Sequence, residues 1–164
     1  VIVTPDKDLG QCVRGTRIVQ YDRRNDTWID EAGVLAKFGV APASVPHWLA
    51  LVGDSADGYP GIPGWGAKTA SAVLARYGAV DSIPDDVAEW DVRGVRSPAR
   101  LAAALRDARQ MARLFVRLAT VVTDIDVGAV DDWEWHGATE RFEEVAERIG
   151  APNLSKRAAG ISLS

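Results

Sequence analysis

The sequence predicts a mainly α-helical domain with a small β contribution. Its 164 residues are 47% hydrophobic and 26% charged, a balance typical of a globular domain with a core. A short β-branched run, VIVT at residues 1–4, opens the chain. Helical spacing is clearest from Pro98 to Val122, where seven apolar residues follow one another at alternating steps of four and three. These observations predict strands first and a helical body after them.

The first thirty residues contain the β contribution. VIVT is expected to be a buried strand, and DKDLGQCV (6–13) to begin a helix with an aspartate at its cap. The segments TRIVQYD (16–22) and TWI (27–29) are typical of strands. The residues NDT between them favour a turn, so a hairpin is expected.

Helices are expected through the rest of the chain. One spans Glu31 to Gly39, where the glycine ends it, and others span about 45–52 and 67–78. The loop GDSADGYPGIPGWG (53–66) separates the last two. Residues 84–94 are expected to be irregular, 98–122 to form one long helix, and about 140–149 to form the last one.

The single opening strand indicates whether the chain is a whole protein or part of a larger one. A lone strand does not form a stable sheet, so VIVT is expected to be the last strand of a larger parallel sheet. The chain is therefore expected to be the C-terminal part of a larger protein. The alternative is a small helical protein that has lost its methionine.

Composition argues against several classes of protein. The longest apolar run, Trp48 to Val52, is far shorter than the roughly 18 residues of a membrane helix, and no signal peptide is recognised. A single cysteine, Cys12, predicts no internal disulfide. His47 and His136 lie far apart, which argues against a zinc site of cysteine and histidine.

The net charge of −4 conceals two segments of opposite charge. Seven arginines and one acid lie from Arg93 to Arg117, whereas nine acids and one base lie from Asp124 to Glu147. Binding to nucleic acid is therefore not excluded by the acidic average. Four arginines at helical spacing form either a second DNA-facing surface or a solvated face: Arg106, Arg109, Arg113 and Arg117.

Two pairs of aspartates are candidate metal ligands. Asp6 and Asp8 lie where a strand ends and a helix begins, and Asp54 and Asp57 are spaced to share one face of a helical turn. Carboxylates without histidine or cysteine suit a hard cation, Mg²⁺ or Mn²⁺. The alternative for each aspartate is a role in capping or turn formation alone.

The segment GIPGWGAKT (61–69) is a candidate phosphate-binding turn. Two glycines at the start of a helix let a backbone approach a phosphate, because the first amides of a helix have no intrahelical partner. Lys68 adds a charge and Thr69 a hydroxyl. An ordinary interhelical turn is the alternative. The segment is not a Walker A loop, because Ala67 separates Gly66 from Lys68.

Residues 52–78, VGDSADGYPGIPGWGAKTASAVLARYG, resemble the 5′-nuclease family, which includes flap endonucleases and the 5′→3′ exonuclease domain of bacterial DNA polymerase I. TPDKDLGQCV (4–13), KFGV (37–40), LALVGD (49–54) and, more weakly, RLATVVTDIDV (117–127) are similar to it too. The resemblance implies the C-terminal part of an α/β PIN-like fold. Residues 1–40 would end the nuclease domain, and 41–164 would form a helical C-terminal domain with its helix-hairpin-helix-like turn at 52–78.

The resemblance also implies an activity. The protein would be a metal-dependent 5′→3′ exonuclease or flap endonuclease that hydrolyses DNA at 5′ ends, and this chain would be its C-terminal half. Two divalent cations, Mg²⁺ or Mn²⁺, would be held by the catalytic residues Asp6, Asp8, Asp54 and Asp57. A helix-three-turn-helix would bind DNA through Gly64, Gly66, Lys68 and Thr69, and would bind K⁺ around Gly61, Ile62 and Trp65.

The implied partners are DNA with a 5′ flap, nick or 5′ end, and the missing N-terminal nuclease half. The implied setting is a monomer in a bacterial-like cytoplasm, associated with the nucleoid and not with a membrane. Two alternatives stay open: a duplex-binding module without catalysis, and a fragment that completes a separate nuclease half. The chain departs from the family at Pro5, where a small residue is usual, and at Ala56, Gly58 and Tyr59, where Ser, Asn and Ile are preferred.

Overall fold

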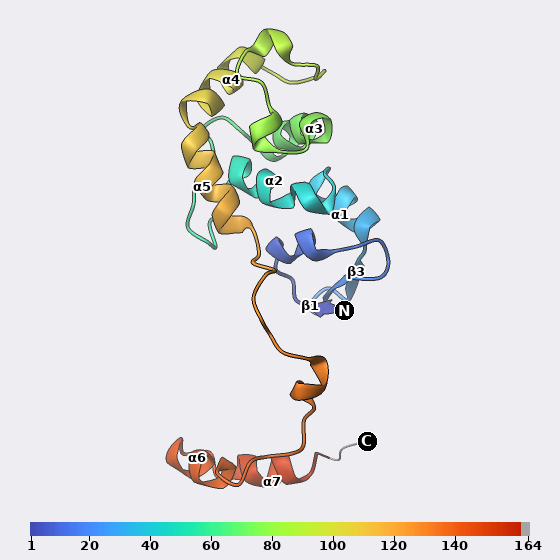
Figure 1. Cartoon of the computed structure of the whole chain (residues 1–164), viewed down its shortest axis with the longest axis vertical. Coiled ribbons are helices and arrows are strands. Elements are labelled where there is room, and N and C mark those ends of the chain that lie inside the picture. Colours follow the sequence, from blue (N-terminus) through green and yellow to red (C-terminus); the bar gives the residue numbers. More distant parts are fainter. Residues whose placement is uncertain (162–164) are drawn as a thin grey trace. The chain divides into compact units, whose positions relative to one another are not determined.

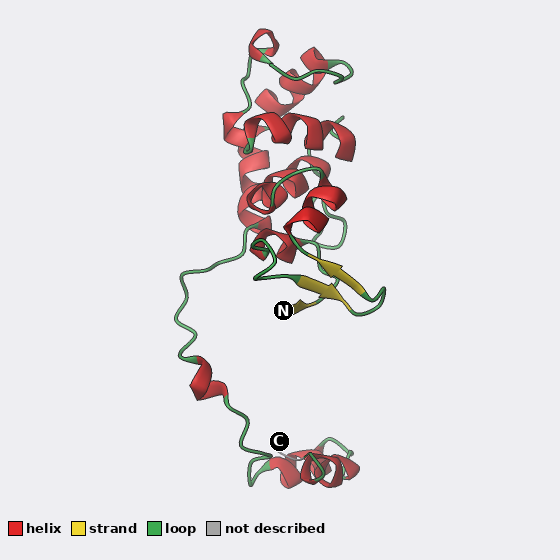
Figure 2. Ribbon diagram, turned by 90° about the vertical axis from the view of Figure 1, so that its right-hand side faces the viewer, coloured by secondary structure: helices red, strands yellow, loops and turns green. Residues whose placement is uncertain are grey.

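The computed structural model describes residues 1–161, which fall into two packed units, one of residues 1–123 and one that begins at Asp124. A three-stranded sheet opens the first unit (Figure 2). Strand β1 (Ile2–Val3) pairs in parallel with β2 (Gln20–Asp22), which pairs antiparallel with β3 (Thr27–Ile29). The predicted hairpin is confirmed.

The prediction that the opening strand is buried is wrong. Val1 is 71% exposed and Val3 62% exposed. The reason is that β1 pairs along one edge only within the described residues, so that little covers its side chains.

The helix expected from DKDLGQCV is only a short 3₁₀ helix, Asp8–Cys12. No side chain caps it at Lys7, although the Asp6 carboxylate accepts a hydrogen bond of 3.1 Å from the Asp8 amide. The segment then ends in Val13, a fully buried core residue in an extended conformation.

The three helices expected before residue 80 are confirmed. They are α1 (Glu31–Phe38), α2 (Val45–Val52) and α3 (Ala67–Tyr77). Helix α1 begins with the Asp30 carboxylate accepting from the Gly33 amide and ends at Gly39, whose φ of 71° lies in the left-handed region.

Helix α2 supplies the centre of the core and packs against α3 and α5 (Figure 1). Its residues Val45, Leu49, Ala50 and Leu51 have no exposed surface. Since Asp54 follows this helix after a single glycine, the rigid core fixes where the acidic loop begins.

The single long helix expected over 98–122 is wrong. Two helices, α4 (Pro98–Asp107) and α5 (Arg109–Ala119), meet at Ala108, whose φ and ψ of −106° and 15° leave the helical region. The break places Arg109 against the 80–85 segment, where its guanidinium has three oxygen partners. The apolar stripe also ends early, because Val122 lies beyond α5 and is 67% exposed.

The second unit contains a 3₁₀ turn (Val130–Trp133), α6 (Phe142–Arg148) and α7 (Asn153–Ala159). Helix α6 corresponds to the helix expected at about 140–149. Helix α7 was not predicted, because its sequence NLSKRAA contains one large apolar residue and therefore no apolar periodicity.

None of the helices in the described residues is by itself long and apolar enough to cross a membrane. One bent pair, Glu31–Phe38 with Pro42–Val52, passes that test by length and composition alone.

Candidate functional site

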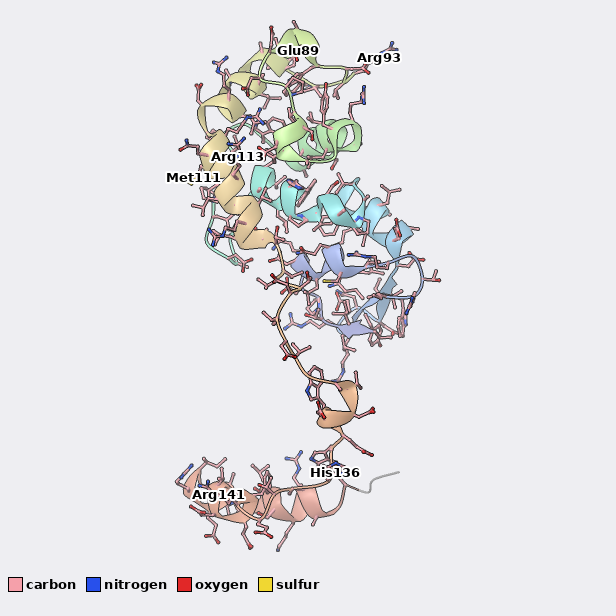
Figure 3. The ribbon with its side chains drawn as sticks, viewed as in Figure 1. Glu89, Arg93, Met111, Arg113, His136 and Arg141 are labelled. Carbon is pink, nitrogen blue, oxygen red and sulfur yellow. The ribbon has the colours of Figure 1, made fainter. Side chains whose placement is uncertain are left out.

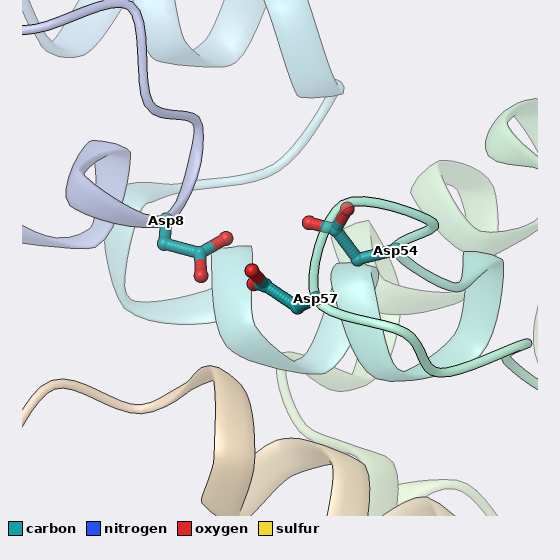
Figure 4. A group of neighbouring side chains, drawn as sticks. All are labelled: Asp8, Asp54 and Asp57. Carbon is teal, nitrogen blue, oxygen red and sulfur yellow. The ribbon is translucent and has the colours of Figure 1, made fainter.

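Three of the four predicted carboxylates lie together. Asp8 begins the 3₁₀ helix, and Asp54 and Asp57 lie in the loop after α2. Each offers an oxygen within 4.8 Å of the other two, and the three side chains point toward one another (Figure 4). Asp54 is only 3% exposed, whereas Asp57 is open to solvent.

The loop that carries Asp54 and Asp57 is closed by its own backbone. The Asp54 amide donates to the Tyr59 carbonyl at 2.9 Å, and the Tyr59 amide donates to the Asp54 carbonyl at 3.1 Å. The Asp54 carboxylate accepts from the Ala56 amide at 3.0 Å. Gly58 has a φ of 80°, in the left-handed region that glycine adopts without steric cost.

Two buried glutamines hold the segment that carries Asp6 and Asp8. Gln11, 8% exposed, donates to the carbonyls of Asp8 and Ala119, each at 2.8 Å. Gln20, 2% exposed, donates to the Asp6 carbonyl. Sequence analysis missed both residues. The available signal was a polar residue inside each of the apolar runs LGQCV and IVQYD.

Asp6 is not part of the group of three. It is exposed, and its carboxylate accepts from the amide of Asp8. Its charge still acts on the group, because it contributes to the raised pKa of Asp8. A metal-ligand role for Asp6 stays a prediction.

Lys7 lies between Asp6 and Asp8 in the sequence. Its ammonium group forms an ion pair with the buried carboxylate of Asp54. Partial burial acts to lower the pKa of Lys7, but the hydrogen bond and charge of Asp54 outweigh burial and raise it. Burial acts to raise the pKa of Asp54, but Lys7 and the Ala56 amide outweigh that effect and lower it. The site thus contains its own counter-ion, which sequence analysis also missed.

Asp8 has no such counter-ion among residues 1–161. Burial, a hydrogen bond with Asp57 and the charges of the other aspartates raise the pKa of Asp8 to about 6. Its Oδ1 atom is buried and has no hydrogen-bond partner among the described residues. An unpaired buried carboxylate oxygen beside two further carboxylates is a donor set that fits a hard divalent cation.

The raised pKa of Asp8 predicts how the stability of the metal-free protein varies with pH. Between about pH 4 and pH 6 the folded protein binds more protons at Asp8 than the unfolded chain does, so the free energy of unfolding falls as pH rises. After allowance for solvent screening, the loss is about 1 kcal/mol. Urea titrations with chelator across this range should show the loss in the wild type and not in Asp8→Asn. The exposed Asp107→Asn is the control, and an equal decline in wild type and Asp8→Asn would contradict the prediction.

The predicted phosphate-binding turn leads directly into α3. Gly64 has a φ of 85°, and Gly66 is the N-cap of α3 without a capping side chain. The helical backbone bonds begin with Ala70 donating to Gly66, so the amides at 67–69 precede the first of them. Beside this end of α3 lies a cavity of about 390 Å³, lined by Lys68, Thr69, Ala72, Gly94, Val95 and Arg96.

The side chains of Ile62 and Trp65 belong to the core. They are 3% and 5% exposed, and the Trp65 indole donates to the Leu101 carbonyl at 3.2 Å. The Ile62 carbonyl already accepts from the Trp65 amide at 3.0 Å. Cation binding at this turn would therefore have to use backbone oxygens, and it stays a prediction.

Three of the four arginines considered for a DNA-facing surface have carboxylate partners. Arg106 pairs with its neighbour Asp107 at 3.4 Å, and Arg109 and Arg113 pair with residues of another segment. Arg109 is mostly buried and bonds Asp85 at 2.7 Å and two carbonyls of the 80–83 segment. Arg113, labelled in Figure 3, pairs with Asp81 at 2.8 Å. These two residues tie α5 to the segment after α3, which leaves Arg117 as the exposed member nearest the end of α5.

Comparison with known proteins identifies the family of this chain. The family model described as 5′-3′ exonuclease, C-terminal SAM fold, matches residues 40–141. DNA polymerase I of Pseudomonas aeruginosa is 37% identical over 154 residues, which cover 89% of this chain and 16% of that protein. The 5′-3′ exonuclease of Aquifex aeolicus is 36% identical over 126 residues, or 77% of this chain and 40% of that one.

A solved structure of a T5 5′-exonuclease mutant matches with a TM-score of 0.57 and 15% identity, over 71% of this chain and 45% of that one. This match shows a shared fold, mainly helical with a small sheet. The chain spans less than half the length of each of these relatives. Because the family model covers more than half of it, the chain belongs to the 5′-3′ exonuclease family, in the C-terminal SAM fold domain.

Proposed function

We propose that this chain is part of a metal-dependent nuclease that hydrolyses DNA phosphodiesters at 5′ ends and 5′ flaps. The observation that carries the proposal is the meeting of the Asp8, Asp54 and Asp57 carboxylates within 4.8 Å, contributed by two segments far apart in the sequence. Membership of the 5′-3′ exonuclease family supports the reaction class.

The carboxylates have a direct role in this proposal. Asp8, Asp54 and Asp57, with Asp6 beside them, would hold two divalent cations, Mg²⁺ or Mn²⁺. Such cations, when bound, activate water and stabilise the leaving oxygen. Lys7 balances the charge of Asp54 and reduces repulsion among the carboxylates.

The turn before α3 would hold the duplex. The first amides of α3, the charge of Lys68 and the hydroxyl of Thr69 suit one phosphate of the backbone, and Gly64 and Gly66 allow close approach. Such contacts position the duplex without reading its sequence. A K⁺ ion at the carbonyls of Gly61, Ile62 and Trp65 belongs to the same proposal.

The proposal extends to the rest of the protein. The relatives named above are much longer than this chain, so we infer that the active enzyme includes a further nuclease half. A monomer in the bacterial cytoplasm, acting at the nucleoid, is the setting we expect, with residues 1–40 belonging to the nuclease domain and 41–164 to the helical domain.

Cleavage of a 5′-labelled flap duplex in Mn²⁺ tests the function. The purified chain is compared with Asp54→Ala, and duplex binding is measured in parallel without metal. Cleavage that is lost in Asp54→Ala supports a working metal site. Retained duplex binding without cleavage would mean either that the further nuclease half completes the active site or that the second candidate function holds, and failure of both would contradict both candidates.

A duplex-binding module without catalysis is that second candidate. It is favoured by the cavity beside α3, whose lining includes Lys68 and Arg96, neither of which forms a salt bridge within the described residues. Two positively charged side chains that form no salt bridge in the described part of the chain, next to a helix N-terminus, make a surface that can bind a phosphate backbone.

Lys68→Ala is expected to weaken binding to every duplex sequence alike. Loss of one phosphate contact should lower the affinity several-fold at low salt and reduce the slope of log K against log salt by about 1. Fluorescence anisotropy with two unrelated duplexes at several salt concentrations measures both quantities. Lys156→Ala, a change of an exposed lysine on α7, is the matched control. Loss on one duplex alone would contradict backbone binding.

A further inference from the structure

Tyr59 ends the loop that carries Asp54 and Asp57, and its side chain is 5% exposed. Its hydroxyl is buried and has no hydrogen-bond partner among the described residues. A buried hydroxyl in this state lowers the stability of the fold, and native structures seldom retain one without a partner such as an ordered water or an ion.

The ring of Tyr59 is held in place. It stacks on Phe115 of α5 with ring centroids 5.2 Å apart and ring planes at 21°. Phe115 is itself only 6% exposed, and the backbone of Tyr59 is paired with that of Asp54. The hydroxyl therefore cannot turn to bulk solvent without breaking core packing.

The backbone bridge that closes the loop pairs Tyr59 directly with Asp54. Tyr59 and Asp54 line the same cavity of about 470 Å³. Burial raises the pKa of Tyr59 above its usual range, and the charges of Asp8, Asp54 and Asp57 raise it further, which agrees with this position. The buried Oδ1 atom of Asp8 also has no hydrogen-bond partner in the part of the chain that the structure describes. The site thus holds one hydroxyl and one carboxylate oxygen that are both unpaired.

We propose that the Tyr59 hydroxyl binds a water molecule of the hydration shell of the divalent cation held by Asp8, Asp54 and Asp57. The inference rests on the metal centre of the proposed function. Mg²⁺ and related cations retain several waters when carboxylates bind them, and Asp54 and Tyr59 both line a cavity at this loop. A tyrosine hydroxyl both donates and accepts, so it can bond a coordinated water without being a ligand itself. Tyr59 is then a positioning residue.

Tyr59→Phe is the test, because it removes only the hydroxyl and keeps the stacked ring. Mn²⁺ binding to the purified chain is measured by the electron paramagnetic resonance signal of free Mn²⁺. We expect the dissociation constant to rise about ten-fold, as for the loss of other outer-shell partners of metal sites. Thermal melts in chelator should show Tyr59→Phe at least as stable as the wild type, because an unpaired buried hydroxyl is gone.

The two measurements separate positioning from packing. A residue that served packing alone would shift the melting temperature equally with and without metal, whereas the proposal requires a loss only when Mn²⁺ is present. Tyr21→Phe, which removes a hydroxyl bonded to Asp26 in the hairpin, is the matched control and should leave Mn²⁺ binding unchanged. Equal Mn²⁺ affinity in wild type and Tyr59→Phe would overturn the role of Tyr59 and leave the metal centre standing. Absence of Mn²⁺ binding in the wild type would overturn the metal centre, and this inference with it.

Discussion

Replacing Gly61 by alanine is expected to destabilise the protein by at least about 3 kcal/mol. An added Cβ would lie 2.5 Å from the Gly53 nitrogen and 2.5 Å from the Val52 carbonyl carbon. Both are backbone atoms and cannot move aside as a flexible side chain would. Gly61 also has a φ of 74°, which disfavours any side chain. The close backbone contacts and the positive φ both oppose a side chain at this position. The loss in the free energy of unfolding should therefore exceed that of an ordinary core substitution.

Urea unfolding of Gly61→Ala measures this loss, and Gly66→Ala is the matched control from the same loop. A Cβ at Gly66 meets nothing within 4 Å, and its φ of −119° is open to all residues. The control should lose less than about 1 kcal/mol, the usual difference between glycine and alanine at a helix N-cap. Similar losses in both variants would mean that the close backbone approach of Gly53 and Gly61 does not determine the fold of this loop.

The elements that sequence analysis predicted correctly are those with local signals. The hairpin has turn residues between two short strands, and α1 and α3 each end at a glycine with positive φ, Gly39 and Gly78. Asp30 caps α1 through its own carboxylate. Each of these signals acts within a few residues, so the chain need not be folded to display it.

The errors come from interactions between distant segments. No glycine or proline marks the break at Ala108. The break coincides with the bonding of Arg109 to residues 80–85. The exposure of β1 depends on which strands lie beside it. A β-branched sequence occurs in buried and in exposed strands, so it does not indicate whether the strand is covered. The spacing of apolar residues alone predicts neither the helix break at Ala108 nor the exposure of β1.

The candidate site divides in the same way. Asp54 and Asp57 share a loop closed by its own hydrogen bonds, and their spacing was visible in the sequence. Asp8 reaches them only because α2 and the 3₁₀ helix pack together. Lys7 pairs with Asp54 across that contact, whereas Gln11 bonds the end of α5. Neither partner follows from spacing along the sequence, although both residues are visible there as polar residues within the motifs.

The metal centre predicts a large effect of Mn²⁺ on stability. Since a ligand that binds only the folded state stabilises it, a concentration one hundred times the dissociation constant should add about 2.7 kcal/mol to the free energy of unfolding. The carboxylates of Asp8, Asp54 and Asp57 repel one another without a cation, so metal removes a strain as well as adding bonds. Thermal melts in millimolar Mn²⁺, reversed by chelator, measure the rise.

Asp54→Asn should abolish most of that rise. The substitution keeps the size of the side chain and an oxygen able to accept from the Ala56 amide, so the loop should persist while the buried charge is lost. Asp26→Asn in the hairpin is the control and should keep the full rise. The control matters because nine acids between Asp124 and Glu147 offer weak sites for any divalent cation, and these act equally in both variants. A rise of equal size in Asp54→Asn and Asp26→Asn would therefore assign the stabilisation to such weak sites, and an unchanged melt of the wild type would contradict a metal centre formed by this chain.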